Sequence, residues 1–199
     1  GLSLGQGLLN IASPMGMELF ILTSVLVSFA LVPISLSRRP APDFHTPETI
    51  SLRRLYIISP LALVGVFING LTIACLFTLT PVVADDQGLK LSEISFLMIT
   101  FIAGGVLLQT PLGWLSDRID RRKVIIGVSI LSCLAGVLCA FTAGMEARWA
   151  YFASMSVFGG LSLSVYGLSI SHANDHLDKR FMVAASSSLL LVNACGACF

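Results

Sequence analysis

The sequence predicts an all-α protein, a polytopic bundle of transmembrane helices, and three observations lead to that prediction. Hydrophobic residues make up 55% of the 199 positions and charged residues only 12%, about half of the ~25% that is typical of soluble domains. The charges gather in short clusters between apolar runs of about 20 residues, the length that crosses ~30 Å of hydrocarbon. The basic residues also fall almost entirely in alternate loops, as a fixed orientation in a bilayer requires.

The apolar runs and the breaks between them define the expected elements in order. Residues 1–12 are expected to be the end of a helix, which Ser13 and Pro14 terminate. A segment with three prolines and six charges, residues 37–54, is expected to be a linker outside the membrane. The expected spans are residues 17–36, 55–81, 94–115, 124–143 and 149–171, followed by a truncated span at 181–199.

The basic residues predict which side of the membrane each loop occupies. Ten of the twelve fall on one side of the expected topology, and only Lys90 and Arg148 fall on the other. Because positively charged loops stay in the cytoplasm, the side with ten is predicted to be cytoplasmic. Those ten are Arg38, Arg39, Arg53, Arg54, Arg118, Arg121, Arg122, Lys123, Lys179 and Arg180.

The most informative motif lies in the cytoplasmic loop that follows the span at 94–115. It reads GWLSDRIDRRK, from Gly113 to Lys123. The glycine would let two helices pack closely, and Asp117 would place a carboxylate where an arginine or a helix N-terminus can hold it. Such a cluster can stabilise one conformation and release it in another. The residues assigned to this latch are Gly113, Asp117, Arg118, Arg121 and Arg122.

This motif resembles the G-x-L-A-D-R/K-x-G-R/K-R/K signature of the major facilitator superfamily. Ser116 stands where the signature has Ala, and Asp120 stands where it has Gly. A turn that needs a positive φ would suit Gly better than Asp.

The resemblance implies the superfamily's general-substrate-transporter fold, in which two halves of six helices each surround a central pathway. It divides this chain into three parts. Residues 1–36 would be the end of the first half, with the outer end of helix 5 and helix 6. Residues 37–54 would be the cytoplasmic linker between the halves. Residues 55–199 would be the second half, with helices 7 to 10 and a truncated helix 11.

Polar residues at helical spacing identify candidate contacts for a solute. Asn69 and Thr72 share one face of their span, as do Ser162 and Tyr166 of theirs, and Gln109 lies on the span before the motif. A polar face inside a membrane is either a seam between helices or a cavity wall. The resemblance favours a cavity, because helices 7 and 10 of the superfamily line the pathway. These five residues are therefore the candidate substrate pathway.

The sequence also restricts the kind of chemistry. No Lys, Arg, Asp or Glu lies near the middle of a full span, so a coupling ion such as a proton would bind in the part of the first half that this sequence does not contain. No nucleophile–base pair or metal motif is present, and His172 and His176 are expected to be solvated. We expect no cofactor, no metal and no nucleic-acid partner.

The function that the resemblance implies is secondary transport of a small solute by alternating access. The protein would be a multi-pass protein of the plasma membrane, which in a bacterium is the inner membrane. Two alternatives stay open. One is a membrane sensor or scaffold that keeps the fold without transporting. The other is a membrane-embedded enzyme, which would need catalytic groups at membrane depth that the spans lack.

Overall fold

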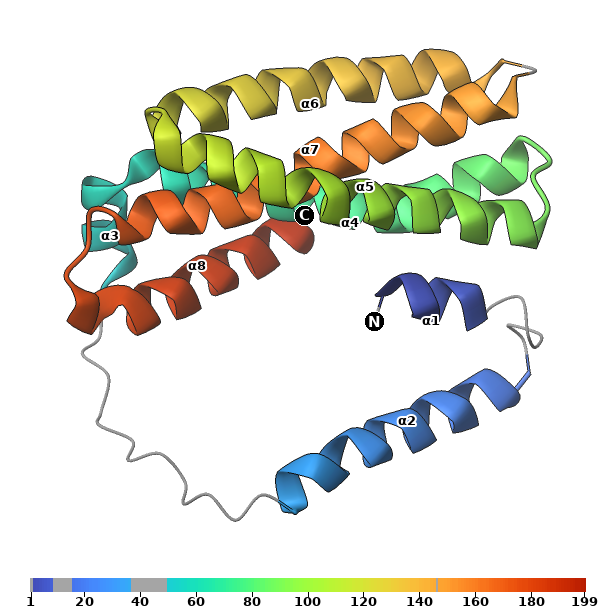
Figure 1. Ribbon diagram of the computed structural model, residues 1–199, viewed down its shortest axis with the longest axis horizontal. Coiled ribbons are helices and arrows are strands. Elements are labelled where there is room, and N and C mark those ends of the chain that lie inside the picture. Colours follow the sequence, from blue (N-terminus) through green and yellow to red (C-terminus); the bar gives the residue numbers. More distant parts are fainter. Residues whose placement is uncertain (1, 9–15, 37–49, 146) are drawn as a thin grey trace.

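The computed structural model describes residues 2–8, 16–36, 50–145 and 147–199, and in these ranges the chain is helical with no strand (Figure 1). This confirms the all-α prediction. The helices, with η1 a single turn of 3₁₀-helix, are α1 (Leu2–Leu8), α2 (Glu18–Ser35), α3 (Leu52–Ile58), α4 (Pro60–Asp86), α5 (Leu91–Arg118), α6 (Arg121–Ala143), α7 (Arg148–Asn174), η1 (Lys179–Phe181) and α8 (Met182–Ala197).

Five helical segments within these ranges are long and apolar enough to cross a membrane. They are α4, α5, α6, α7 and the segment 179–197, which consists of η1 and α8. They run roughly alongside one another, so that successive connections alternate between the two ends of the bundle (Figure 1). The α5–α6 turn, α3 and η1 lie at one end, and they carry most of the basic residues. The alternation follows the pattern that the loop charges predict, and the chain is that of a multi-pass membrane protein.

The structure divides the expected span that follows the linker into two helices. The apolar run 55–81 is broken at Ser59, whose φ of −144° and ψ of 76° leave the helical region, and Pro60 starts α4. Proline is well suited to the first position of a helix, because its missing N–H would have no helical partner there. Arg53 and Arg54 lie in the first turn of α3, so the last residues of the expected linker are helical. The rest of the expected linker, residues 37–49, and the break at Ser13 and Pro14 lie outside the described residues.

Glycines set the closest helix contact in the bundle, the crossing of α5 and α7. A Cβ built on Gly104 would lie 1.8 Å from the backbone oxygen of Ser156, and one built on Gly159 would lie 2.1 Å from that of Phe101. Only glycine leaves room for backbones at this separation. The crossing fixes α7 as the central helix, with α4, α5 and α6 packed around it.

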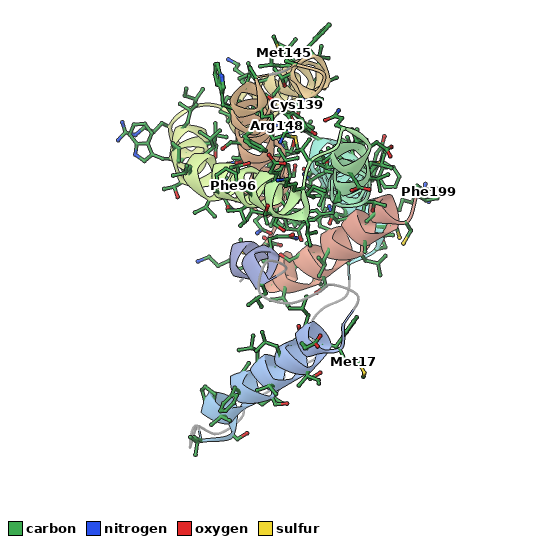
Figure 2. The ribbon with its side chains drawn as sticks, turned by 90° about the vertical axis from the view of Figure 1, so that its right-hand side faces the viewer. Met17, Phe96, Cys139, Met145, Arg148 and Phe199 are labelled. Carbon is green, nitrogen blue, oxygen red and sulfur yellow. The ribbon has the colours of Figure 1, made fainter. Side chains whose placement is uncertain are left out.

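At the end of the bundle opposite the basic loops, an ion pair joins the first turns of α5 and α7. Glu93 accepts a hydrogen bond from the backbone N–H of Lys90 at 2.8 Å and pairs with Arg148. Figure 2 views the molecule from this end, where Arg148 and Met145 lie close to the viewer.

Helix α2 stands apart from the five long segments in both views (Figures 1 and 2). Its described side chains are mostly exposed, including Phe20 and Phe29. An apolar helix with no protein partner needs lipid or further helices around it.

Candidate functional site

The predicted latch forms an ion-pair cluster around one arginine. Arg121, in the first turn of α6, pairs with Asp117 in the last turn of α5. Its other terminal nitrogen lies 3.0 Å from a carboxylate oxygen of Asp175, which caps the C-terminal end of α7. The arginine side chain is only 16% exposed, whereas those of Asp117 and Asp175 are 68% and 50% exposed. One mostly buried cation therefore joins three helices.

The helix dipoles explain why Asp175 and Arg121 need each other. A carboxylate at the C-terminal end of α7 meets the negative end of that helix dipole, and a cation at the start of α6 meets the positive end. Each charge is unfavourable alone, but together Asp175 and Arg121 compensate each other. Charge-assisted pairs of this kind are stronger than neutral hydrogen bonds.

Asp120 does not need the backbone geometry that its place in the signature suggested. Its φ is −52°, and its side chain accepts a hydrogen bond from the backbone N–H of Arg122 at 3.1 Å. Aspartate is a favoured N-cap residue because it satisfies such a free donor. The turn between α5 and α6 thus uses Asp120 as a helix cap, with no positive φ.

The remaining latch residues take different positions. The guanidinium of Arg118 lies 3.7 Å from the ring centroid of Trp114, a cation–π contact on the same helix. Arg122 is exposed. A Cβ at Gly113 would meet no atom within 4 Å, so the expected close helix contact does not form at Gly113 within the described part of the chain. Close approach occurs instead around Gly104.

A hydrogen-bonded belt crosses the middle of the bundle. Asn69 on α4 donates from Nδ2 to the backbone oxygen of Ser162 on α7 at 2.7 Å. The Ser162 hydroxyl lies 2.7 Å from that of Ser132 on α6. On the other side, the amide of Asn193 on α8 donates to the backbone oxygen of Val66 at 2.8 Å. The same amide approaches the Asn69 carbonyl oxygen at 3.4 Å. Four helices are thus connected through neutral polar groups.

Three of the five predicted pathway residues line one cavity. Asn69, Thr72 and Ser162 face a space of about 280 Å³ between α4, α6 and α7, together with Ser129 and Ser132. Asn69 therefore belongs both to a seam between helices and to a cavity wall, since its amide forms a helix–helix hydrogen bond and also borders a cavity.

The other two predicted pathway residues lie elsewhere. Gln109 lines a cleft of about 190 Å³ between α5 and α7, whose wall also includes Gly113 and Asp117 of the latch. Tyr166 is partly buried against a hydrophobic cluster formed by α3, α4, η1 and α8. The predicted pathway is therefore split among two cavities and a packed seam.

His172 is not the solvated histidine that its place at a helix exit suggested. It is buried in the last turn of α7, and its ring centroid lies 4.8 Å from that of His176. His176 in turn places Nδ1 2.9 Å from the backbone oxygen of His172. Within the described ranges, no group of three metal-ligating side chains is found.

Comparison with known families decides what kind of bundle this is. Residues 62–199, more than half of the chain, match the sequence model of the Major Facilitator Superfamily. The chain belongs to this superfamily.

Curated relatives agree with the superfamily match. The chain is 23% identical over 193 residues to the uncharacterized MFS-type transporter YcaD of Escherichia fergusonii, an alignment that covers 96% of this chain and 49% of that protein. It is 28% identical over 130 residues to the uncharacterized MFS-type transporter Ent638_1421 of Enterobacter sp. strain 638, covering 64% of this chain and 32% of the relative. The chain spans about half the length of the first of these relatives. No solved structure matches the chain.

Within this superfamily member, sequence reasoning missed three residues that the structure adds to the sites. Asp175 is the second carboxylate on Arg121, while Ser132 and Asn193 extend the polar belt. Of these three residues, only Asp175 could have been suspected from the sequence. An acid that directly follows a helix meets the negative end of the helix dipole, so a cation is expected nearby. Ser132 and Asn193 are isolated polar residues in apolar runs, and their partners become evident only after the helices are packed.

Proposed function

We propose that this chain is part of a secondary transporter that moves a small solute by alternating access across the plasma membrane. In a bacterium, that membrane is the inner membrane. Residues 1–36 belong to the end of the first half, residues 37–54 to the linker, and residues 55–199 to the second half. Membership of the superfamily and the five long apolar segments support this assignment.

The observation that carries the proposed mechanism is the bridging of three helices by Arg121. Its contacts with Asp117 and Asp175 tie the α5–α6 turn to the end of α7. A cluster that forms in one conformation and opens in the other biases the equilibrium between them, because only differential contacts can shift such an equilibrium. Asp117 is the more exposed of the two acids, so it is the one that a segment from the first half can reach.

The solute is proposed to be small and uncharged where it meets this half. Hydroxyl and amide groups supply the polar lining of the cavity at Asn69, and among the residues that the structure describes no charged side chain lines it. A buried charge on the solute would need a paired charge on the protein. If transport is coupled to protons, the proton-carrying group belongs to the first half.

Transport by the full-length protein in proteoliposomes tests this mechanism. Asp117→Asn removes one carboxylate from Arg121, and we expect solute flux to fall roughly fivefold or more if the latch sets the conformational equilibrium. Asp178→Asn is the matched control, because this acid lies near the same end but pairs with Arg180, at 3.6 Å. We expect its flux to stay near wild type.

Two results would contradict the proposal in different ways. Wild-type flux in Asp117→Asn, with wild-type expression, would refute the latch and leave transport intact. Failure of the wild-type protein to transport any solute of a broad panel of small neutral compounds, under counterflow conditions, would favour a sensor or scaffold that keeps the fold.

A further inference from the structure

Two hydroxyl groups that line the cavity at Asn69 already use their protons inside their own helices. Thr72 on α4 donates its hydroxyl proton to the backbone oxygen of Ile68 at 2.9 Å. Ser129 on α6 donates in the same way to the backbone oxygen of Ile125 at 2.8 Å. A hydroxyl group carries one proton and two lone pairs. What each of these side chains can offer to a molecule in the cavity is therefore a lone pair.

The rest of the polar lining is also richer in acceptors than in donors. The hydroxyl oxygens of Ser132 and Ser162 lie 2.7 Å apart, so one of their two protons is shared between them and one is left. Asn69 donates one of its two amide protons to the backbone oxygen of Ser162. Apart from the weakly polar thiol of Cys133, the described side chains of this cavity thus offer four hydroxyl oxygens as acceptors but only two protons as donors.

This imbalance favours a solute that donates hydrogen bonds. A molecule with O–H or N–H groups satisfies the free lone pairs without disturbing any bond of the protein. A molecule that can only accept would have to compete with the backbone oxygens of Ile68 and Ile125 for the hydroxyl protons. Unpaired polar groups are costly away from water, so a site of this kind discriminates against the wrong partner. Thr72 and Ser129 also belong to different helices, so one solute needs two donors to satisfy both.

The cavity continues into apolar space. It shares Thr72, Gly136 and Phe158 with a second cavity of about 460 Å³ between the same three helices. That second cavity is lined mostly by aliphatic and aromatic side chains, such as those of Leu76 and Met155. Its volume falls within the ~300–1,000 Å³ that is usual for small-molecule sites. A solute bound at Thr72 and Ser129 therefore has room for an apolar body beside its donor groups.

We propose that this cavity binds a neutral, amphipathic solute that donates two hydrogen bonds from one end, as vicinal diols and primary amides do. Thr72 and Ser129 select this class of compound by accepting the two hydrogen bonds, and the apolar cavity takes the rest of the molecule. The inference rests on the proposed transport function, to which it adds the chemical class of the solute. Compounds of the same shape that carry only ether oxygens are excluded, because they leave both acceptors unpaired.

Binding of a model diol to the purified full-length protein tests this selectivity without any need for transport. The probes are cis-cyclohexane-1,2-diol and its dimethyl ether, which share a ring and two oxygens but differ in having two donors or none. A ligand that binds the folded state raises the midpoint of thermal unfolding. We expect the ether to need an about tenfold higher concentration than the diol for the same rise. In Thr72→Val/Ser129→Ala, the diol should be no better than the ether.

Thr100→Val/Ser187→Ala is the matched control. These hydroxyls also donate to backbone oxygens of their own helices, those of Leu97 at 2.7 Å and Val183 at 3.0 Å, but neither residue lines the cavity. We expect this variant to keep the wild-type preference for the diol. Without ligand, both double variants should unfold at the wild-type midpoint, because each change removes a bond within one helix. If Thr72→Val/Ser129→Ala unfolds at a lower temperature, Ser129→Ala alone replaces it, and the preference should then fall only in part.

Three outcomes would overturn the inference. Equal rises with diol and ether in the wild type would show that donors are not selected. A preference for the diol that persists in Thr72→Val/Ser129→Ala would place the selectivity at other residues. The absence of any rise with the diol would show that the cavity does not bind this class of compound. The counterflow assay stays independent of these results. Flux of other solutes without diol binding would refute the inference alone, and selective binding without flux of any solute would refute transport but keep the site.

Discussion

At the scale of single residues, Asn69 connects its own helix, α4, to two others. Its amide bonds to α7, and its carbonyl oxygen is approached by Asn193 of α8. An amide in the membrane interior is tolerated because such partners exist. The same connections that stabilise the bundle border the cavity proposed for the solute, so stability and transport are coupled at this residue.

Replacing Asn69 with alanine should destabilise the protein by about 0.6 kcal/mol, and by up to ~1.7 kcal/mol if both neighbouring contacts are lost together. Thr72→Ala is the control, because the Thr72 hydroxyl bonds to the backbone oxygen of Ile68 in its own helix and, among the described residues, to no other helix. Unfolding of the full-length protein in mixed micelles, followed by circular dichroism, measures both. A Thr72→Ala effect as large as that of Asn69→Ala would contradict the assignment of the belt.

The spacing of polar residues predicted Asn69 and Ser162 as members of polar faces, but it could not predict that they bond to each other. The acceptor on Ser162 is a backbone oxygen, which every residue carries and which leaves no mark in a sequence. Asp120 shows the opposite situation. Its identity alone was compatible with a helix cap, and comparison with a glycine in the family signature directed attention to a positive φ that the turn does not use.

At the scale of helices, the α5–α7 crossing depends on glycines that face backbone atoms. Gly160 adds to it, since a Cβ there would lie 2.4 Å from a methyl group of Leu108 and 2.8 Å from the backbone oxygen of Gly104. A flexible side chain can move aside, but a helix backbone cannot do so without separating the two helices. Gly104 and Gly159, which both face backbone, therefore cannot accept a side chain without separating α5 and α7.

Gly159→Ala should accordingly destabilise the protein by about 1–3 kcal/mol, the usual cost of overpacking. Gly127→Ala is the matched control in α6, because a Cβ there would meet no atom within 4 Å. In that open position, alanine should be neutral or stabilising, since it favours helix more than glycine does by about 1 kcal/mol. The midpoint of thermal unfolding in detergent compares the two. Equal midpoints would show that the helices do not cross at Gly159.

The spans themselves were predictable from hydropathy, and their ends were less so. The expected span 55–81 became α3 and α4, because the run LYIISPLALV is apolar on both sides of Ser59 and hydropathy does not detect a change of direction. The stretch between the expected spans 55–81 and 94–115 is shorter than expected at both ends, since α4 continues to Asp86 and α5 begins at Leu91. Charged residues can extend a helix beyond the hydrocarbon, where water satisfies them.

At the scale of the whole molecule, the distribution of charge gives the bundle two different ends. The Arg121 cluster and the two arginines over the Phe181 ring, Arg54 and Arg180, lie at one end, and the Glu93–Arg148 pair lies at the other. The sequence predicted this asymmetry without any knowledge of packing, because it depends only on the number of spans between loops. The position of the helices around α7 could not be predicted in the same way, since it follows from glycine contacts between distant residues.

This asymmetry predicts which positions a reagent can reach from outside the cell. In the full-length protein with its native cysteines replaced, Lys90→Cys should react with a membrane-impermeant maleimide on intact spheroplasts. Lys123→Cys should react only after permeabilisation, because the end with ten basic residues is proposed to stay in the cytoplasm. Both positions are exposed, so burial does not limit their reaction.

Each of those substitutions removes a positive charge, which itself influences orientation, so a second pair provides the control. Asp86→Cys and Asp178→Cys remove acidic residues instead, and acids contribute little to orientation. They should give the same result, with position 86 reactive from outside and position 178 protected. Labelling of position 178 in intact spheroplasts would mean that a span has been miscounted, and it would move the latch to the outer face. Agreement of the two pairs would fix the side of the membrane on which the latch acts, whatever solute the protein carries.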